Sequence, residues 1–203
     1  MLRSLTLFVV CLIVTAPTLA DEADVRAQKI VDRAIKALGG KKALKKTHVI
    51  RMEEEGTFYG MGQALPYQGR YYMAMPNRTR FEIVNAFLIV RDGDKGWMQT
   101  QGVVTPLTDA QIKEAKLESH CQHMASLIPL AKPNKKLKLS LAGEEEIEGE
   151  ACVGINIDAE GQRQTQLYFS KKTGLLKRTS YVVAPEELGL SLIHISEPTR
   201  HCL

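Results

Sequence analysis

Two histidines and a cysteine, His120, Cys121 and His123, come closest in type and spacing to a metal site. Imidazole nitrogen and thiolate sulfur are ligands that Zn²⁺ prefers. Successive residues of a helix point about 100° apart, so a helix here would place His120 and His123 on one face and Cys121 on another. No second ligand pair lies nearby in the sequence. We therefore expect no bound metal, and a polar helix face beside an apolar one.

Nucleophilic catalysis would need a serine, cysteine or threonine supported by a histidine and an acid. The Gly-x-Ser-x-Gly turn that often carries such a serine is absent, and His48, His120 and His123 are the imidazoles left once the C-terminal tail is set aside. Gly60 and Gly62 lead into no predicted helix, so they form no phosphate loop. We expect no enzymatic activity and no cofactor, with an envelope hydrolase as the least favoured alternative.

Both ends of the chain carry features that lie outside any fold. Residues 1–20 combine Arg3, an apolar run over 5–14 and a small-residue site ending at Ala20, which is typical of a cleaved secretory signal. That run is too short to span a bilayer. Residues 190–203 resemble the translation of a transposase adapter used in DNA library preparation, which predicts a natural gene cut near Gly189. We expect a periplasmic or secreted protein with one domain over 21–189.

The charge balance and the cysteine spacing argue against a nucleic-acid-binding protein and against a disulfide-rich scaffold. Lysine and arginine number 27 against 23 acids, a net charge of +4, and this mild excess does not suggest a nucleic-acid partner. Within 21–189 the cysteines are Cys121 and Cys152, without the dense spacing of a disulfide scaffold. We expect two small buried apolar residues, with a disulfide between them as the alternative.

Two stretches have helical periodicity. Apolar residues recur every three or four positions over 21–38, and Gly39-Gly40 ends that helix, with a short basic turn expected over 41–46. Thr108 and Asp109 cap a second helix that runs to about Leu127. Its apolar stripe consists of Ile112, Leu117, Cys121, Met124 and Ile128.

Ten short runs of β-branched, aromatic and alternating residues predict strands. Their connections are too short for the crossovers that parallel strands need, so neighbours are antiparallel. We expect an α+β fold in which one curved antiparallel sheet has its apolar face covered by helices, with a groove between them for a ligand. The predicted strands cover 48–58, 65–75, 79–84, 87–91, 96–100, 103–106, 137–147, 151–159, 162–170 and 175–183.

Apolar residues at alternating strand positions, with two from the second helix, are the expected ligand-binding side chains. Methionine suits a surface that accommodates variable apolar partners. Ordinary core packing is the alternative, and it is the favoured interpretation both for the strand residues and for Trp97. The set is Met52, Tyr71, Met73, Phe81, Ile83, Leu88, Val90, Trp97, Leu117 and Met124.

Lysines cluster in two segments and suggest contact with a membrane surface. Each lysine near anionic headgroups is worth about 1 kcal/mol. Solubility is the alternative and the favoured role. The lysines are Lys41, Lys42, Lys45 and Lys46, with Lys132, Lys135, Lys136 and Lys138.

Three strings, over 37–40, 92–97 and 167–181, resemble a bacterial exported family of outer-membrane lipoprotein-sorting proteins, related in fold to the periplasmic lipoprotein carrier and its outer-membrane receptor. The resemblance implies an open half β-barrel wrapped around helices, with an apolar cavity for the acyl chains of a lipoprotein. It also implies further strands after the hairpin at Thr173-Gly174. The last strands would then be missing here, leaving 175–183 with an unpaired edge.

The sequence thus predicts an exported, non-catalytic binding protein for a lipid or an acylated protein, monomeric when intact. The alternative is a periplasmic scaffold or sensor domain that docks a protein partner on the same sheet. A filled interior would favour the scaffold.

Overall fold

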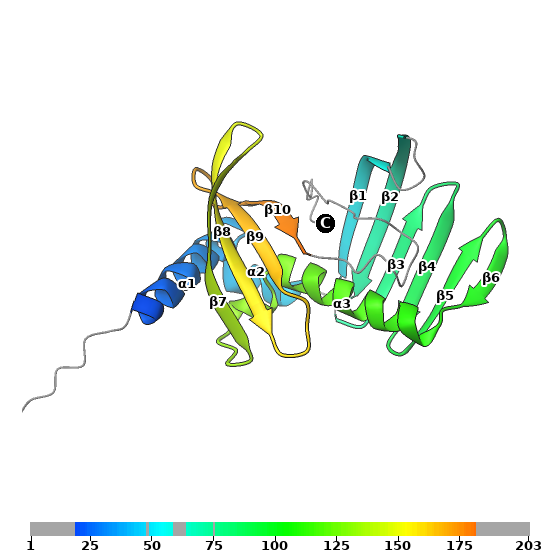
Figure 1. Ribbon diagram of the computed structural model, residues 1–203, viewed down its shortest axis with the longest axis horizontal. Coiled ribbons are helices and arrows are strands. Elements are labelled where there is room, and N and C mark those ends of the chain that lie inside the picture. The colour runs from blue at the N-terminus through cyan, green and yellow to red at the C-terminus, as the bar shows by residue number, and fades with distance from the viewer. Residues whose placement is uncertain (1–18, 48, 59–63, 75, 182–203) are drawn as a thin grey trace, which may run out of the picture.

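The computed structural model describes residues 19–47, 49–58, 64–74 and 76–181 (Figure 1). Most of the expected signal segment, His48 and the tail over 190–203 lie outside these residues. The expected cleavage after Ala20 falls in the first turn of a described helix. None of the helices in the described ranges is long and apolar enough to cross a membrane.

The described ranges contain three α-helices and one short 3-10 helix, and both predicted helices are confirmed. They are α1 (Leu19–Ala37), α3 (Asp109–Ala125) and, where a basic turn was expected, α2 (Gly40–Lys46), followed later by η1 (Pro129–Ala131). Thr108 begins α3 with a capping box. The Gln111 backbone N–H donates to Thr108 Oγ1 at 3.3 Å, and the Thr108 N–H donates to Gln111 Oε1 at 2.9 Å.

All ten predicted strands are confirmed, but the expectation of one curved sheet is wrong. The strands form two antiparallel sheets, a six-stranded meander in the order β1-β2-β3-β4-β5-β6 (sheet A) and a four-stranded sheet in the order β10-β9-β8-β7 (sheet B). Helix α3 separates the two sets along the chain, and β1 and β10 are edge strands of different sheets among the described residues. Sheet A contains β1 (Val49–Phe58), β2 (Leu65–Ala74), β3 (Arg78–Ile83), β4 (Phe87–Asp92), β5 (Lys95–Thr100) and β6 (Val103–Pro106); sheet B contains β7 (Leu137–Ile147), β8 (Glu150–Ala159), β9 (Thr165–Ser170) and β10 (Leu176–Ser180).

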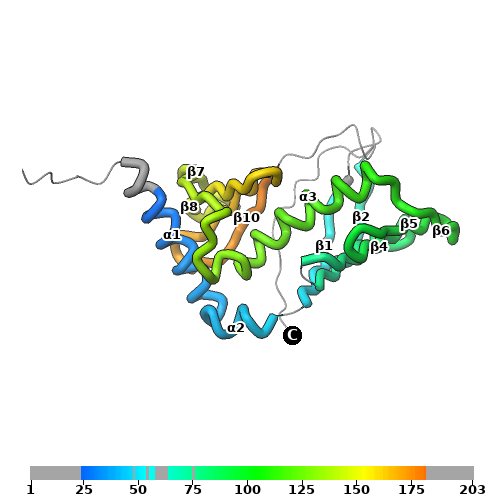
Figure 2. Tube along the Cα trace, turned by 90° about the horizontal axis from the view of Figure 1, so that it is seen from below, coloured from blue at the N-terminus to red at the C-terminus, as the bar shows by residue number. Residues whose placement is uncertain are grey.

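The main hydrophobic core lies on sheet B. Helix α1 packs against β7, while α3 runs along one face of sheet A and reaches sheet B at its C-terminal end (Figures 1 and 2). No described residue of sheet A belongs to this core cluster. Its largest fully buried side chains are Val31, Ile35, Leu127, Ile155, Ile157, Leu167 and Phe169.

Both described cysteines are buried free thiols. The prediction that Cys121 and Cys152 are small buried residues is confirmed, and the alternative of a disulfide between them is wrong. Burial raises the pKa of the Cys121 thiol to about 11, and burial also raises the pKa of Cys152.

Candidate functional site

Helix α3 is bound to both sheets by charged side chains. On the sheet A side, Arg91 Nη2 donates to Ser119 Oγ at 2.9 Å, and Lys116 Nζ lies 2.5 Å from Asp94 Oδ1. On the sheet B side, the guanidinium of Arg163 contacts both carboxylate oxygens of Glu114, at 2.8 and 2.9 Å. The helix is therefore fixed across one face of sheet A.

Arg91 identifies which face of sheet A is turned toward α3. Side chains two residues apart on a strand share a face, and so do directly paired residues on neighbouring strands. The register pairs Arg91 with Thr79 and Thr79 with Met73, and it places an apolar row on the same side. This inner face consists of Ile50, Met52, Tyr71, Met73, Phe81, Ile83, Phe87, Ile89 and Met98.

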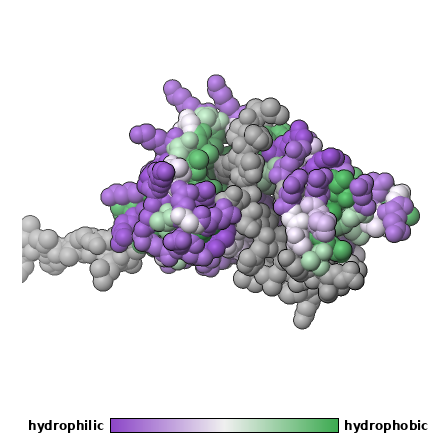
Figure 3. All heavy atoms as spheres, turned by 90° about the horizontal axis from the view of Figure 1, so that it is seen from above, coloured by the Kyte–Doolittle hydropathy of each residue, from purple (hydrophilic) through white to green (hydrophobic). Residues whose placement is uncertain are grey.

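The inner face is apolar but incompletely covered. Met73 is buried at 1% exposure, whereas the other members are half-buried. The Phe81 ring packs at 5.7 Å from Tyr71 and 5.8 Å from Phe87, between ring centroids. Hydrophobic side chains accordingly show at the surface of the sheet A part of the molecule, on the right of Figure 3.

The structure brings together only half of the expected binding set. Met52, Tyr71, Met73, Phe81 and Ile83 share the inner face. Leu117 lies on α3 and is half-buried.

The structure places the remaining four residues of the set elsewhere. Leu88 and Val90 pair with Glu82 and Arg80, and Val90 pairs with Trp97, so these apolar residues lie on the outer face. Trp97 is 40% exposed there, and the expectation that it packs in the core is wrong. Met124 is buried in the main core against sheet B.

Four inner-face residues were missed by the sequence prediction: Ile50, Phe87, Ile89 and Met98. Strand β4 is apolar at four successive positions, 87–90, so it has no alternation to indicate which two point inward. The β3–β4 hairpin could have identified Phe87 and Ile89. Its register pairs Ile83 with Phe87 and Phe81 with Ile89, and paired residues lie on the same face of a sheet.

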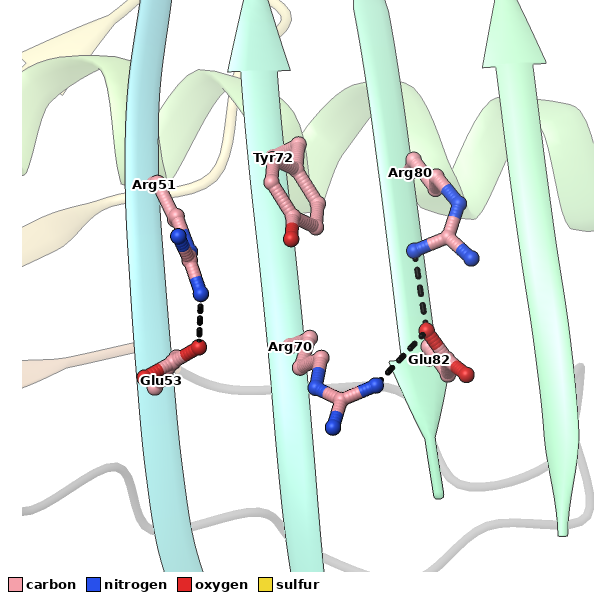
Figure 4. A pocket seen from close by; sticks show the side chains of 6 residues that line it. All are labelled: Arg51, Glu53, Arg70, Tyr72, Arg80 and Glu82. Carbon is pink, nitrogen blue, oxygen red and sulfur yellow. Dashed lines mark hydrogen bonds and ion pairs between the residues drawn. The ribbon is translucent and has the colours of Figure 1, made fainter. Parts of the chain in front are cut away.

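The outer face over β1 to β3 is a charged surface whose charges are paired with one another. A hollow of about 440 Å³ is lined by three arginines, two glutamates and a tyrosine (Figure 4). Arg80 Nη1 donates to Glu82 Oε2 at 2.9 Å, and Arg51 pairs with Glu53, whose hydrogen bond and charge raise the pKa of Arg51. The Tyr72 ring lies 5.6 and 5.8 Å from the guanidinium carbons of Arg80 and Arg51. This compensation is typical of a water-facing surface, so the inner face is the better candidate site.

His120 and His123 lie on α3 in a partly desolvated environment. Burial lowers the pKa of His120, and burial together with the charge of His120 lowers the pKa of His123 to about 4. Both imidazoles are therefore neutral at pH 7. Within the described ranges, no three His, Cys, Asp or Glu side chains come together as a metal site.

These histidines predict a pH-dependent stability. A histidine whose pKa falls from 6.5 to about 4 on folding stabilises the native state fully above pH 6.5, and it loses that contribution as the pH falls toward 4. The carboxyl groups of Asp94, Glu145 and Glu150 also have lowered pKa values, but their protonation reduces the stability only below about pH 4.5. Between pH 7 and 5, His123→Gln is expected to reduce the fall in Tm, and His120, whose pKa is also lowered, accounts for part of the fall that remains. Thermal melts at both pH values measure this, and an unchanged fall would contradict it.

Comparison with known proteins gives similarity of fold alone. The sequence matches no protein-family model and no curated protein. Among solved structures it is similar to a DUF1329 family protein from Desulfovibrio piger, at 12% identity over 77% of this chain and 73% of that chain, with a TM-score of 0.40. A LolA superfamily protein from Nitrosomonas europaea matches at 10% identity over 77% and 71%, with a TM-score of 0.37. The lipoprotein LppX of Mycobacterium tuberculosis matches at 13% identity over 79% and 89%, also with a TM-score of 0.37. Similarity at this level assigns neither a family nor a ligand.

Proposed function

We propose that this protein is an exported, non-catalytic binding protein that holds the acyl chain of a lipid or lipid-modified protein between the inner face of sheet A and helix α3. The observation that carries the proposal is the half-buried apolar row, which lies outside the main core although a helix is fixed across it. The secretory signal expected over 1–20 supports a periplasmic or secreted location.

Apolar burial alone supplies enough affinity for such a ligand. Each buried methylene contributes about 0.8 kcal/mol, so ten methylenes contribute about 8 kcal/mol before ordering costs. The flexible side chains of Met52 and Met98 can adjust to chains of different shape. The inner face therefore needs no charged contact to hold an acyl chain.

A substitution that fills the space tests the proposal. Ile89 is half-buried at the centre of the inner face, where it pairs with Phe81 and Met98. We expect Ile89→Trp to weaken uptake of a fluorescent hexadecanoic acid methyl ester by at least about tenfold, because the indole occupies the volume that the chain needs. Val104→Trp is the matched control, since Val104 is exposed on the outer face. Failure of the unmodified protein to bind the ester, or equal binding by both variants, would contradict the proposal.

A protein-docking scaffold is the second candidate, and a different surface favours it. Trp97 and Val104 are large exposed apolar side chains on the outer face of the last two strands of sheet A, and β6 is an edge strand among the described residues. Exposed apolar residues on a sheet edge are typical of surfaces that pair with another chain. Under this function Val104→Lys would abolish partner binding and leave acyl uptake unchanged.

A further inference from the structure

A second hollow, of about 630 Å³, lies where α2, η1 and the turn between β2 and β3 meet. Leu44, Ile128 and Pro129 contribute apolar walls. Lys45 and Lys132 line the same hollow from opposite segments of the chain. A space with apolar walls and two cations suits an amphiphilic anion better than a purely apolar or purely ionic ligand.

The charge around this hollow is of one sign. Lys45 and Lys132 line the hollow, and the stretches of chain around them, residues 39–47 and 128–142, carry eight lysines and no acidic residue. Because the whole chain has a net charge of +4, the remainder of the chain carries −4. The hollow therefore lies in a local positive potential that attracts anions, although the protein as a whole is only mildly basic.

The positive charge comes from the lysines and not from the histidine beside them. His123 also lines the hollow, and its pKa of about 4 leaves the imidazole neutral at pH 7. The affinity of the hollow for an anion is thus set at neutral pH by ammonium groups. Lys45 and Lys132 are exposed enough to move onto a ligand.

The hollow is close to the inner face of sheet A. Pro76, in the turn after β2, lines the hollow, and Met73, three residues earlier, belongs to the inner face. An extended chain rises about 3.3 Å per residue, so these two positions are at most about 10 Å apart. An acyl chain of ordinary length can lie on the inner face while its polar end reaches the lysines.

We infer that this hollow binds the anionic headgroup, a carboxylate or a phosphate, of the amphiphile whose acyl chain lies on the inner face of sheet A. The inference rests on the proposed function and adds the chemical class of the ligand. Lys45 and Lys132 bind the anion, and the apolar walls accommodate the first methylenes of its chain.

Matched probes separate this inference from the function on which it rests. A fluorescent hexadecanoic acid and its methyl ester share one acyl chain and differ in the anionic group. We expect the full chain to bind the acid about tenfold more tightly than the ester, since hydrogen bonds to charged groups are the stronger ones. Lys45→Gln with Lys132→Gln is expected to remove this difference and to leave ester binding unchanged. Lys95→Gln with Lys113→Gln, which removes the same charge from exposed positions elsewhere, is expected to keep it.

Each other outcome overturns the inference in a distinguishable way. Equal binding of acid and ester, unaffected by the lysine substitutions, would leave the acyl-binding function in place without a headgroup site. Binding of neither probe would remove both. Pelleting with phosphatidylglycerol vesicles that depends on Lys45 and Lys132, without preference for the free acid, would mean that the lysines attract a membrane surface instead of one headgroup.

Discussion

Glu114→Gln is expected to lower the free energy of unfolding by about 3–5 kcal/mol, because it leaves the Arg163 guanidinium buried without its counter-charge. The Glu114 side chain is 2% exposed and that of Arg163 is 10% exposed. Arg163 Nη2 donates a hydrogen bond to Glu114 Oε2 at 2.9 Å, and Arg163 Nη1 lies 2.8 Å from Glu114 Oε1 as an ion pair without a hydrogen bond. Urea unfolding followed by circular dichroism measures the change.

Two further variants test whether this loss of stability comes from the unpaired buried charge. Asp94→Asn breaks the ion pair with Lys116 on the other side of the same helix, where both side chains are largely exposed, and it is expected to lower the stability much less than Glu114→Gln does. The pair of changes Glu114→Leu and Arg163→Met removes both charges together and is expected to recover most of the stability. Equal losses of stability in Glu114→Gln and Asp94→Asn would contradict the expectation that breaking the buried ion pair costs more than breaking the exposed one.

Phe169→Ala is expected to cost about 3–5 kcal/mol, whereas Phe81→Ala is expected to cost about 1 kcal/mol. Phe169 is 1% exposed in the main core on β9, so truncation leaves a cavity whose lining cannot collapse. Phe81 is half-buried on the inner face of sheet A and keeps contact with water before the change. The cost of truncation follows the burial of the ring and the volume left empty.

The ratio of these two costs tests how full the inner face is. Both variants are measured by urea unfolding under the same conditions, with Phe81→Leu as a control that preserves most of the apolar volume. If Phe81→Ala costs as much as Phe169→Ala, the inner face is a filled core and the acyl-binding proposal loses its basis. If it costs about 1 kcal/mol and reduces acyl uptake, the ring belongs to a ligand surface.

Local features of the sequence predicted the elements well. The capping residues Thr108 and Asp109 and the apolar stripe behind them predicted α3, and short turns predicted every antiparallel neighbour within each meander. The division into two sheets could not be predicted in the same way. Strand runs show which neighbours pair, but they do not show whether a strand before α3 pairs with one after it.

The candidate site was predictable only where a strand is amphipathic. Phe81 and Ile83 alternate with Arg80 and Glu82, so their face follows from the sequence. The apolar run over 87–90 gives no such contrast. The contacts that position α3 join residues far apart in sequence, such as Glu114 and Arg163, and the types of these residues alone do not pair them.

The alkylation rates of the two buried thiols can measure how often the structure around each of them opens. With a pKa of about 11, Cys121 is ionised in about one molecule in ten thousand at pH 7, and burial also keeps reagents away from it. Alkylation of Cys121 and Cys152 therefore requires the surrounding structure to open first. Cys121 lies on α3 and Cys152 on β8, so the two labelling rates, followed peptide by peptide in a mass spectrometer, compare release of the helix with unfolding of sheet B. A ligand that holds α3 against sheet A would slow the first rate more than the second.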